Sequence, residues 1–352
     1  MRIIQALDAL DFGDGVSNDV INLYTLLQEM GYETAIYSKW VNEKVSRYRN
    51  DIEKLRLQPD DILLHHFSGE SHILDAVLAG GCFRVMVYHN ITPPGFWDKN
   101  SRKRDPGELQ IDEIKERYNY FLGVSEFNLQ CLRELGADGP MGVLPNVIDF
   151  SKIDTVPRRE LRENPQQKLF LFVGRVAPNK KHEDIIDIFE CYYREINCNS
   201  RLIFAGNYAD NTAYYTSLQA RLSSLCCRKA VTFTGKVSDE ELYNYYKNAD
   251  IFLCMSEHEG FCIPLLESMY CGVPTVGYDA CAVGATMGGA GILVSQKKPQ
   301  LLARLAHVVL TQPNIRRQIL LKQNEWVSEF SKPAIQKRLE KLITLWRQKQ
   351  HE

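Results

Sequence analysis

Short β-rich runs alternate with longer amphipathic stretches over most of this sequence. Alternation of this kind predicts a parallel sheet, because each strand needs a crossover helix before its parallel neighbour can begin. In the first half, a helix is expected at Asn18–Met30, closed by Gly31 as its C-terminal cap. The strands expected there are Arg2–Ala6, Glu33–Tyr37, Ile62–His66, Phe83–Tyr88, Tyr120–Val124 and Gly142–Leu144.

The apolar pattern fades into charge and proline around residues 149–168, which indicates an interdomain linker. A second αβ series follows, with strands expected at Leu169–Val173, Arg201–Ala205, Val231–Thr234, Ile251–Met255 and Thr275–Gly277. We therefore predict an α/β protein with two Rossmann-like, doubly wound parallel-sheet domains, residues 1–160 and 161–332. Residues 333–352 predict a basic amphipathic helix, for which packing on protein is favoured over binding to a membrane.

Composition narrows the class of protein further. At 352 residues, the chain exceeds the roughly 250–300 residues at which single cores stop growing. An apolar share of 45% and a charged share of 24% exclude disordered, collagen-like and coiled-coil classes. With 42 basic and 44 acidic residues, the net charge of −2 provides no overall attraction to nucleic acid or to an anionic membrane. Any attraction to an anion must then be local.

Targeting and redox signals favour a cytoplasmic protein. The amino-terminal residues predict a buried strand and not a secretory signal, and no apolar run reaches the ~18 residues of a spanning helix. The ten cysteines are scattered without a CxxC pair. Free buried thiols in a reducing cytoplasm are therefore expected, and disulfides or a zinc site are not.

The sequence EHEGFCIPLLE carries the first candidate chemistry. Glu259 is expected on a loop after a buried strand, and Glu267 in the first turn of a helix that Pro264 begins. Ligands bind at this edge of open α/β sheets, and the amides of residues 261–265 would favour a phosphate there. Two carboxylates beside a helix N-terminus suit a ligand that is both a polyol and an anion, as a nucleotide sugar is. Taken alone, each glutamate is better explained as ordinary, Glu267 complementing the helix dipole and Glu259 being solvated.

A second motif, LFVGRVAPNKKHEDII, leaves the first strand of the second series. Gly174 follows the strand, Arg175 comes next, and Lys180 or Lys181 precedes a helix that begins near His182. A bidentate guanidinium and an ammonium five residues apart suit a diphosphate. Solvated basic side chains are the alternative, which weighs more for Lys181 than for Arg175.

Two segments of the first half are expected at the corresponding edge of its sheet. Gly13 and Gly15 lie between the first strand and the first helix, with Ser17 or Asn18 as the helix cap, and glycine there lets backbone approach a ligand. The loop lacks the GxGxxG spacing, so a dinucleotide dehydrogenase is not supported. His89 follows an apolar strand and can hydrogen-bond a sugar hydroxyl or an acceptor, while a structural histidine is about as well supported.

The residues after this histidine are candidates for contacts with an acceptor. Asn90 and Thr92 precede two prolines, and a loop bounded by proline and glycine then holds Arg102, Lys103 and Arg104. This basic loop could steer a phosphate-bearing or membrane-borne acceptor. A solvated basic loop is the commoner explanation.

Together these motifs resemble the retaining GT-B glycosyltransferases of the group-1 family, also called family 4, over essentially the whole chain. The family marker is two glutamates separated by seven residues, a spacing that Glu259 and Glu267 have. The context EGFCIPLLE resembles the usual EGFGLPLLE, with Cys262 in place of a glycine. The resemblance implies an acceptor-side domain at residues 1–160, a nucleotide-sugar-binding domain at 161–332 and a final helix that crosses back to the first domain.

The resemblance also implies roles for individual residues. Glu259 would contact hydroxyls of the donor sugar and Glu267 those of the ribose. Arg175 and Lys180 would neutralise the leaving diphosphate. The other donor-side positions are family-like glycines and a loop whose amides add to that neutralisation: Gly13, Gly15, Gly174, Gly206, Gly235, Gly260, Phe261, Cys262 and Ile263.

The implied reaction is the transfer of a hexose with retention, mannose or glucose being favoured and GDP-mannose preferred to UDP-glucose. His89 matches a histidine near the reacting sugar, and Ser125 lies in a family-like segment on the acceptor side. The acceptor would be a saccharide or lipid-linked saccharide of a surface polysaccharide, which allows peripheral membrane association. No DxD-type metal motif stands out, so no metal or other cofactor is expected.

Three other classes of function remain open. A glycoside hydrolase also uses two carboxylates, but Arg175 and Lys180 have no purpose there without a phosphate. A GT-B nucleotide-sugar epimerase shares both domains and the diphosphate site. Analysis of the products separates the epimerase from a transferase. A non-catalytic nucleotide-sugar-binding module would bind the donor in calorimetry without turnover on any acceptor.

Overall fold

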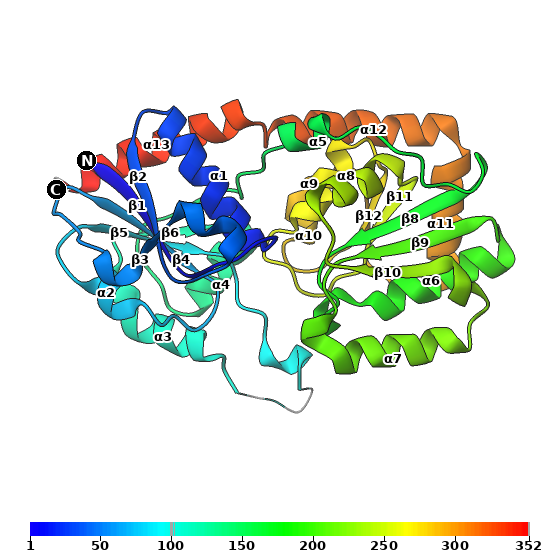
Figure 1. Ribbon diagram of the computed structural model, residues 1–352, viewed down its shortest axis with the longest axis horizontal. Helices are drawn as coiled ribbons and strands as arrows, with labels where there is room; N and C mark the ends of the chain where they lie inside the picture. The colour runs from blue at the N-terminus through cyan, green and yellow to red at the C-terminus, as the bar shows by residue number, and fades with distance from the viewer. Residues whose placement is uncertain (99–100, 102, 351–352) are drawn as a thin grey trace. The chain divides into compact units, whose positions relative to one another are not determined.

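The computed structural model describes residues 1–98, 101 and 103–350. The chain forms two compact units, Met1–Asp149 with Glu329–Glu352, and Phe150–Ser328 (Figure 1). The first boundary therefore lies at residue 149 and not at the predicted 160. The short helix α5 (Ser151–Thr155) belongs to the second unit, because Phe150 stacks on Tyr270 and the Tyr270 hydroxyl donates to Asp154.

The charged stretch predicted as a linker is tied to the second unit by its own arginines. The Arg159 amide donates to the Asn244 side chain at 2.8 Å, and Arg162 donates to the Asn248 carbonyl at 2.7 Å. Fading apolar periodicity thus marked a segment that has no regular structure between α5 and β8. It did not mark a segment without contacts, because polar side chains can anchor a loop as well as apolar ones.

The first unit is built on a seven-stranded parallel sheet in the order β3-β2-β1-β4-β5-β6-β7. Its strands are β1 (Arg2–Leu10), β2 (Glu33–Val41), β3 (Arg49–Asp51), β4 (Ile62–Phe67), β5 (Phe83–Tyr88), β6 (Tyr120–Gly123) and β7 (Met141–Val143). Its helices are α1 (Gly15–Glu29), α2 (Leu74–Leu78), α3 (Pro106–Ile114), α4 (Glu126–Glu134) and α13 (Lys332–Gln350). All six predicted strands are present, and the three-residue edge strand β3 is additional.

Helices α1 and α13 cover one face of this sheet, and α2, α3 and α4 cover the other (Figure 1). Gly31 ends α1 as predicted, with a left-handed φ of 83°. The apolar stripe of the basic C-terminal helix lies in the core of the first unit, where it meets α1 and the sheet: Ile335, Leu339, Ile343 and Trp346. Protein therefore covers the stripe that a membrane would otherwise have to cover.

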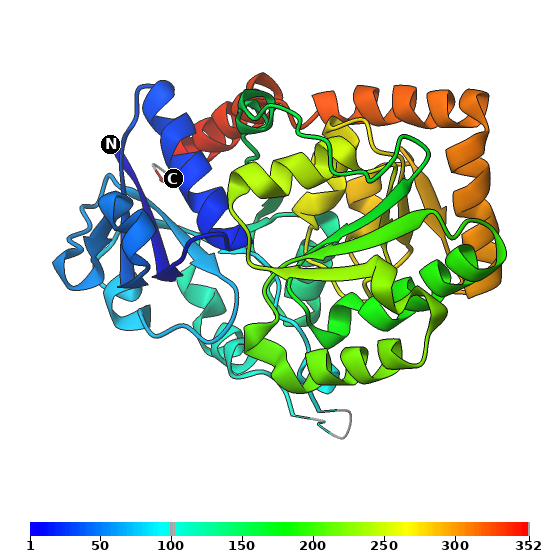
Figure 2. The ribbon, with the colours of Figure 1, turned by 45° about the vertical axis from the view of Figure 1, so that its right-hand side comes forward.

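The second unit has a six-stranded parallel sheet in the order β10-β9-β8-β11-β12-β13. Its strands are β8 (Lys168–Val173), β9 (Ser200–Ala205), β10 (Val231–Gly235), β11 (Ile251–Cys254), β12 (Thr275–Tyr278) and β13 (Ile292–Val294). Its longer helices are α6 (His182–Glu195), α7 (Thr212–Ser223), α8 (Asp239–Asn248), α9 (Ile263–Tyr270), α11 (Pro299–Thr311) and α12 (Pro313–Ser328), with α10 (Val283–Met287) between β12 and β13. Helices lie on both faces of this sheet, which Figure 2 brings forward, with α6 beside α11 and α9 beside α12.

Both sheets reverse their strand order at the same relative position. The reversal falls between β1 and β4 in the first unit and between β8 and β11 in the second. Ligands of doubly wound sheets bind at the carboxyl ends of the strands that flank such a point. The loops after β8 and β11 carry the two motifs of the second half, so the topology brings these motifs to one edge.

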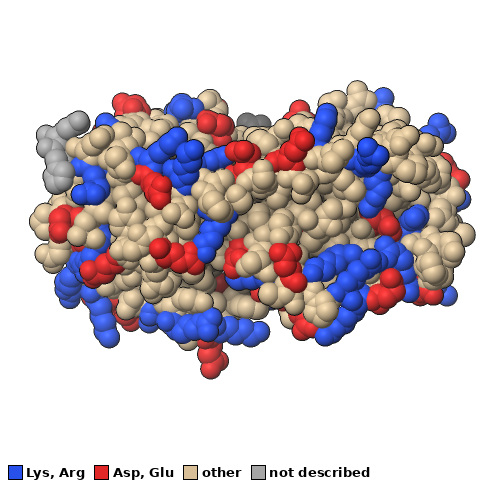
Figure 3. Space-filling view, turned by 90° about the horizontal axis from the view of Figure 1, so that it is seen from above, with Lys and Arg blue, Asp and Glu red and all other residues tan. Residues whose placement is uncertain are grey.

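Surface charge, helix hydropathy and cysteine exposure describe the rest of the molecule. Basic and acidic side chains are interspersed over the face in Figure 3. Among the described residues, no helix is both long and apolar enough to cross a bilayer. All ten cysteines are described and free, and five are buried, but Cys198 and Cys226 are exposed, which corrects the expectation of uniformly buried thiols.

Candidate functional site

The centre of the site in the second unit is a part-buried ion pair between the two motifs. Glu259 lies on the loop after β11 and is 7% exposed, and its Oε2 is 2.6 Å from the Nζ of Lys180. Burial disfavours the Lys180 ammonium, but the nearby Glu259 carboxylate outweighs this and raises the pKa of Lys180. Lys180 is therefore cationic over the whole physiological range.

The two loops are also joined through backbone groups. The side-chain amide of Asn179 donates to the His258 carbonyl at 3.1 Å, and the Glu257 amide donates to the Asn179 carbonyl at 2.8 Å. Lys181 points to Glu257 instead, with its Nζ 3.1 Å from Oε2. The two lysines therefore have different partners: Lys180 contacts Glu259, and Lys181 contacts Glu257. Sequence analysis missed Asn179, although it stands beside Lys180 in the motif.

Cys262 occupies the turn at which the family motif has glycine. Its φ of 74° lies in the left-handed region that glycine adopts without strain, so the cysteine keeps the backbone conformation of the turn. Helix α9 begins directly after it. Two of the amides predicted for a phosphate are unsuitable, because Pro264 has no N–H and the Leu265 amide donates to the Cys262 carbonyl at 3.1 Å.

Glu267 lies just beyond the first turn of α9, one residue further into the helix than predicted. It is the fifth residue of α9, and the first turn of that helix holds no acidic side chain, so Glu267 does not complement the helix dipole. Its carboxylate accepts a hydrogen bond from the Tyr246 hydroxyl at 2.8 Å. Burial raises the pKa of Glu267 to about 7, and the Tyr246 hydrogen bond acts against that rise. Sequence analysis gave no signal for Tyr246, which comes from α8.

Three predicted glycines end neighbouring strands at the same edge. Gly206 follows β9, and its amide donates to the Gly235 carbonyl at 3.1 Å. A Cβ added at Gly206 would lie 2.0 Å from the Gly174 carbonyl oxygen, so no other residue fits there. Arg175 follows Gly174 and is exposed, and within the described ranges no salt bridge engages its guanidinium. Arg175 is thus positioned to meet an anion from solvent.

The glycine loop of the first unit differs from its prediction. Helix α1 begins at Gly15, so that glycine is helical, and only Gly13 has the left-handed backbone, with φ 73°. The N-cap is Asp14 and neither Ser17 nor Asn18, since the Asp14 carboxylate accepts from the Ser17 amide at 3.0 Å. A carboxylate at the cap competes with any anion for this helix end.

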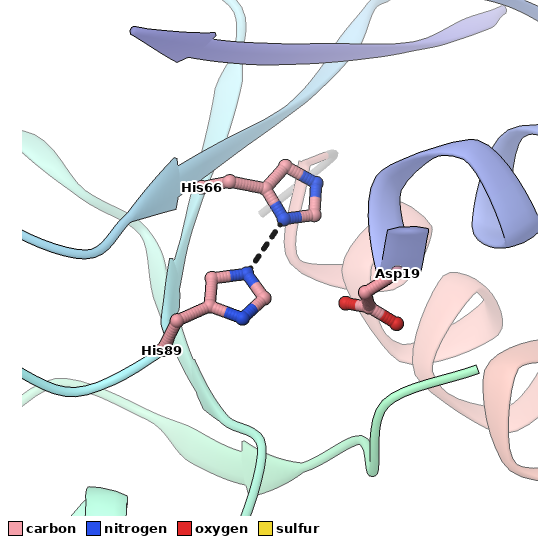
Figure 4. A group of neighbouring side chains, drawn as sticks. All are labelled: Asp19, His66 and His89. Atoms are coloured by element: carbon pink, nitrogen blue, oxygen red, sulfur yellow. Dashed lines mark hydrogen bonds between the residues drawn. The ribbon is translucent and has the colours of Figure 1, made fainter. Parts of the chain in front are cut away.

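His89 follows β5 and is half-buried, and a second histidine contacts it (Figure 4). The Nδ1 of His66, on β4, is 2.9 Å from the Nε2 of His89, and the Nε2 of His66 is 3.0 Å from the Oε1 of Gln5. Burial lowers the pKa of His89 to about 3 and also lowers the pKa of His66 well below its usual value, so both rings are neutral. The Asp19 carboxylate, from α1, faces the two rings, and burial raises its pKa to about 7.

Sequence analysis missed Gln5, Asp19 and His66. The adjacent histidines in LLHHF were the available signal, because two imidazoles at the end of a fully buried strand need hydrogen-bond partners. The residues that meet His66 come from β1 and α1. Only the sheet order brings them together.

Asn90 and Ser125, both predicted to lie on the acceptor side, form hydrogen bonds within the first unit. The Asn90 side-chain amide donates to the Asn128 side-chain oxygen at 3.1 Å, and that of Asn128 donates to the Tyr88 carbonyl at 3.0 Å. Ser125 caps α4 by accepting from the Asn128 amide at 3.3 Å. These contacts explain both predicted residues through the loop after β5 and the start of α4. Thr92 is half-buried nearby in the sequence.

The predicted basic loop is partly neutralised. The Arg104 guanidinium donates to Asp112 at 2.6 Å, so it is paired within its own unit and is not an open anion contact, as the steering prediction required. Lys103 is exposed. Arg102 lies outside the described residues.

Two groups of side chains in the described part of the chain bring three metal-type ligand atoms within 4.8 Å of one another. One is Asp19 with His66 and His89, and the other is Glu259 with Cys254 and Cys262. The Lys180 ammonium on Glu259 opposes a cation at the second group. The expectation that no metal is used stays a prediction.

The sheets of both Rossmann-like units follow the strand order 3-2-1-4-5-6, and the first has a seventh strand at its edge. Two such units in one chain are the arrangement of the GT-B class of fold. The structure of Anabaena Alr3699/HepE in complex with UDP and glucose shares this fold, with a TM-score of 0.74 and 14% identity, over 98% of this chain and 100% of that one. Residues 155–325 match the model of the family glycosyl transferases group 1. The matched segment is just under half of the chain and lies in the second unit, so the second unit is similar to this family.

Curated relatives match parts of the chain. Mannosylfructose-phosphate synthase of Agrobacterium fabrum is 36% identical over 132 residues, which cover 36% of this chain and 29% of the relative. O-antigen chain mannosyltransferase B of Escherichia coli is 26% identical over 165 residues, 46% of this chain and 41% of the relative. The chain thus spans less than half the length of these two relatives.

Proposed function

We propose that this chain is a retaining, metal-independent family 4 glycosyltransferase. It moves a hexose, mannose or glucose, from a nucleotide-diphosphate sugar to a saccharide or lipid-linked saccharide acceptor. The observation that carries the proposal is the part-buried ion pair of Lys180 and Glu259, 2.6 Å apart, where the loops after β8 and β11 meet. A cation and a carboxylate fixed side by side serve a ligand that presents phosphate and hydroxyl groups together.

The donor capacity of Lys180 supports this assignment. An ammonium group has three N–H donors, and Glu259 occupies one of them, which leaves two for phosphate oxygens. The free carboxylate oxygen of Glu259 accepts from a sugar hydroxyl. Arg175, exposed after β8, adds a second cation for the diphosphate.

The proposed reaction depends on positioning and charge. The acceptor hydroxyl attacks the anomeric carbon from the face that the diphosphate leaves, and a phosphate oxygen takes the proton of that hydroxyl. Arg175 and Lys180 stabilise the charge that develops on the leaving group, which is the role for which preorganised cations are most effective. Glu267, held by Tyr246, is assigned to the ribose hydroxyls.

The names of the curated relatives favour mannose. Two of them are a mannosylfructose-phosphate synthase and an O-antigen chain mannosyltransferase, so GDP-mannose is proposed ahead of UDP-glucose. The O-antigen relative also supports an acceptor that belongs to a surface polysaccharide. Such an acceptor places the reaction in the cytoplasm, with peripheral association of the enzyme at the membrane when the acceptor is lipid-linked.

A panel of nucleotide sugars tests the proposal in two stages. In thermal denaturation, the true donor raises the melting temperature in step with RT ln(1 + [L]/Kd), and stabilisation by none of the panel would sink the proposal. Lys180→Met should abolish the stabilisation, while Lys181→Met, its neighbour with a different partner, should retain it. The two variants distinguish a specific contact of Lys180 with the donor from the loss of any one positive charge in this loop.

Product analysis then decides among the classes of function. The expected products are free nucleoside diphosphate and an enlarged acceptor, in which the transferred sugar keeps the anomeric configuration that it had in the donor. Both should form in the presence of EDTA. An isomerised nucleotide sugar would show an epimerase. Donor binding without turnover on any saccharide acceptor would show a binding module.

A further inference from the structure

A chain of buried hydrogen bonds runs from helix α1 to His89. The Gln5 side-chain amide donates to the Val20 carbonyl at 3.1 Å, and the Gln5 Oε1 is 3.0 Å from the Nε2 of His66. The Nδ1 of His66 is in turn 2.9 Å from the Nε2 of His89. Gln5 is fully buried, and His66 is 2% exposed.

The direction of every bond in this chain follows from its first member. A backbone carbonyl can only accept, so the NH₂ group of Gln5 faces Val20 and its oxygen faces His66. The Nε2 of His66 must then carry the proton that it donates to Gln5. A neutral imidazole has one N–H, so the Nδ1 of His66 can only accept, and the Nε2 of His89 donates to it.

His89 is left with one nitrogen for a ligand. Its Nδ1 has no proton in this arrangement, and in Figure 4 it lies on the side of the ring away from His66. We propose that Gln5 and His66 are positioning residues that fix His89 in its Nε2–H tautomer, so that Nδ1 accepts a hydrogen bond from a substrate hydroxyl. The hydroxyl is one of the sugar, so this inference rests on the proposed function.

The fixed tautomer selects the chemistry of the group that His89 can bind. A hydroxyl donates its proton to Nδ1, whereas a phosphate oxygen or a carbonyl has no proton to give. Without the chain from Gln5, either tautomer could face the ligand. The chain thus assigns His89 to the polyol part of a nucleotide sugar or an acceptor and excludes the diphosphate as its partner.

A metal ion is the competing explanation for the same side chains. Ligand atoms of Asp19, His66 and His89 lie within 4.8 Å of one another, as a bound divalent cation would need. A cation requires lone pairs on both facing nitrogens, while their 2.9 Å contact is satisfied by a shared proton. The hydrogen-bond chain therefore predicts a site that works without a metal.

The tautomer can be observed directly by ¹⁵N NMR of protein labelled at histidine, with His89 assigned by its loss in His89→Gln. The wild-type chain should show a protonated Nε2 and an unprotonated Nδ1 for His89. In His66→Phe the Nε2–H of His89 would face an apolar ring and lose its acceptor, so the proton should move to Nδ1. His66→Asn keeps an acceptor oxygen near the position of Nδ1 and should preserve the wild-type pattern.

A matched control lies one residue away. His65 is also buried in β4, but it contacts Tyr118 at 2.6 Å and takes no part in the chain. His65→Phe should leave the His89 spectrum unchanged. A His89 spectrum that is the same in His66→Phe as in the wild type would overturn the proposal, as would stoichiometric zinc in the purified protein.

Kinetics give a second readout. His66→Phe should lower kcat/KM roughly tenfold, the scale of one buried hydrogen bond left unmade, and His66→Asn should recover most of it. Equal losses in the two variants would show a merely structural role and contradict the inference. The spectra need no turnover, so a failure of the proposed transferase activity and a failure of the hydrogen-bond chain are seen in different experiments.

Discussion

The two units share a strand order but place different chemistry at the reversal of their sheets. In the second unit, Lys180 and Glu259 form a part-buried ion pair, and an exposed Arg175 follows β8. In the first unit, neutral side chains meet instead, with His66 bonded to His89 and to Gln5. Charge suits a diphosphate, whereas the direction of a neutral hydrogen bond suits a hydroxyl. The shared strand order therefore leaves the chemistry of each edge to the side chains at the strand ends.

Their buried histidines differ in the same way. In the first unit, His65 and His66 each have hydrogen-bond partners. In the second unit, His182 begins α6 among Phe172 and Phe204, and neither of its ring nitrogens has a hydrogen-bond partner among the residues that the structure describes. Burial lowers the pKa of His182 to about 3, so the ring stays neutral. The first unit uses its histidines as polar groups, and the second packs one as an aromatic ring.

The largest expected effect is on the pH dependence of the free energy of unfolding, through the Asp19 carboxyl group of the first unit. Burial raises the pKa of Asp19 to about 7, although the Val147 amide donates to it. Between its unfolded value near 4 and this value, the folded chain binds one more proton than the unfolded chain, so stability falls as pH rises. The loss is on the order of 4 kcal/mol from pH 4 to pH 7. Asp19→Asn removes this pH-dependent loss. Urea unfolding should therefore show the free energy of unfolding of the variant rising relative to that of the wild type from pH 4 to pH 7.

Asp61 provides the control of opposite sign. Burial acts to raise its pKa, but the Arg2 guanidinium outweighs burial and the pKa is lowered. Its stabilisation is therefore present above its unfolded pKa and is lost as pH falls. A difference between Asp19→Asn and the wild type that is the same at pH 4 and pH 7 would contradict the linkage.

The next effect tests the charged edge of the second unit. Arg175→Ala should lower turnover by about 10²–10³, or about 3–4 kcal/mol, because one preorganised electrostatic donor is lost from the transition state. Lys181→Met removes a nearby positive charge that pairs with Glu257, and it should stay near the wild-type rate. Steady-state kinetics with the identified donor measure both, and near wild-type turnover for Arg175→Ala removes its proposed role.

A smaller effect concerns the carboxylate proposed for the ribose. Tyr246→Phe removes the hydroxyl that donates to Glu267, which orients the carboxylate and holds down its pKa of about 7. The KM for the donor should rise roughly tenfold with kcat little changed, since the lost contact serves binding in the ground state and the transition state alike. Tyr245→Phe, on the same helix, should have no such effect. A change in kcat alone would argue against the ribose assignment.

The smallest effect tests the contrast between the buried histidines. His182→Phe should stabilise the protein by about 1 kcal/mol, because it removes a buried polar ring without partners and keeps the aromatic contacts. His65→Phe should destabilise by a similar amount, since it leaves the Tyr118 hydroxyl without its partner. Thermal or urea unfolding of the two variants measures this. Effects of the same sign would break the comparison.

The sequence by itself determined the two αβ series and the charged motifs of the second unit. Eleven strands were predicted within a few residues of their bounds, because buried parallel strands are continuous apolar runs. Gly174 and Gly206 come directly after such runs and Gly235 ends one, while Lys180 and Glu259 lie on the loops that follow β8 and β11. Strand ends and motif spacing therefore placed them at one edge. The edge strands β3 and β13 were missed, since three residues carry no period to detect.

Only the tertiary structure decided which groups meet across the first unit. His66 is 61 residues from Gln5 and 23 from His89, and Asp19 comes from a helix, so no local pattern joins them. The same limit applies to Tyr246 with Glu267 and to the boundary at residue 149. Periodicity records which face of an element is buried. The partner of a polar side chain depends on sheet order and register, which form only when the whole unit folds.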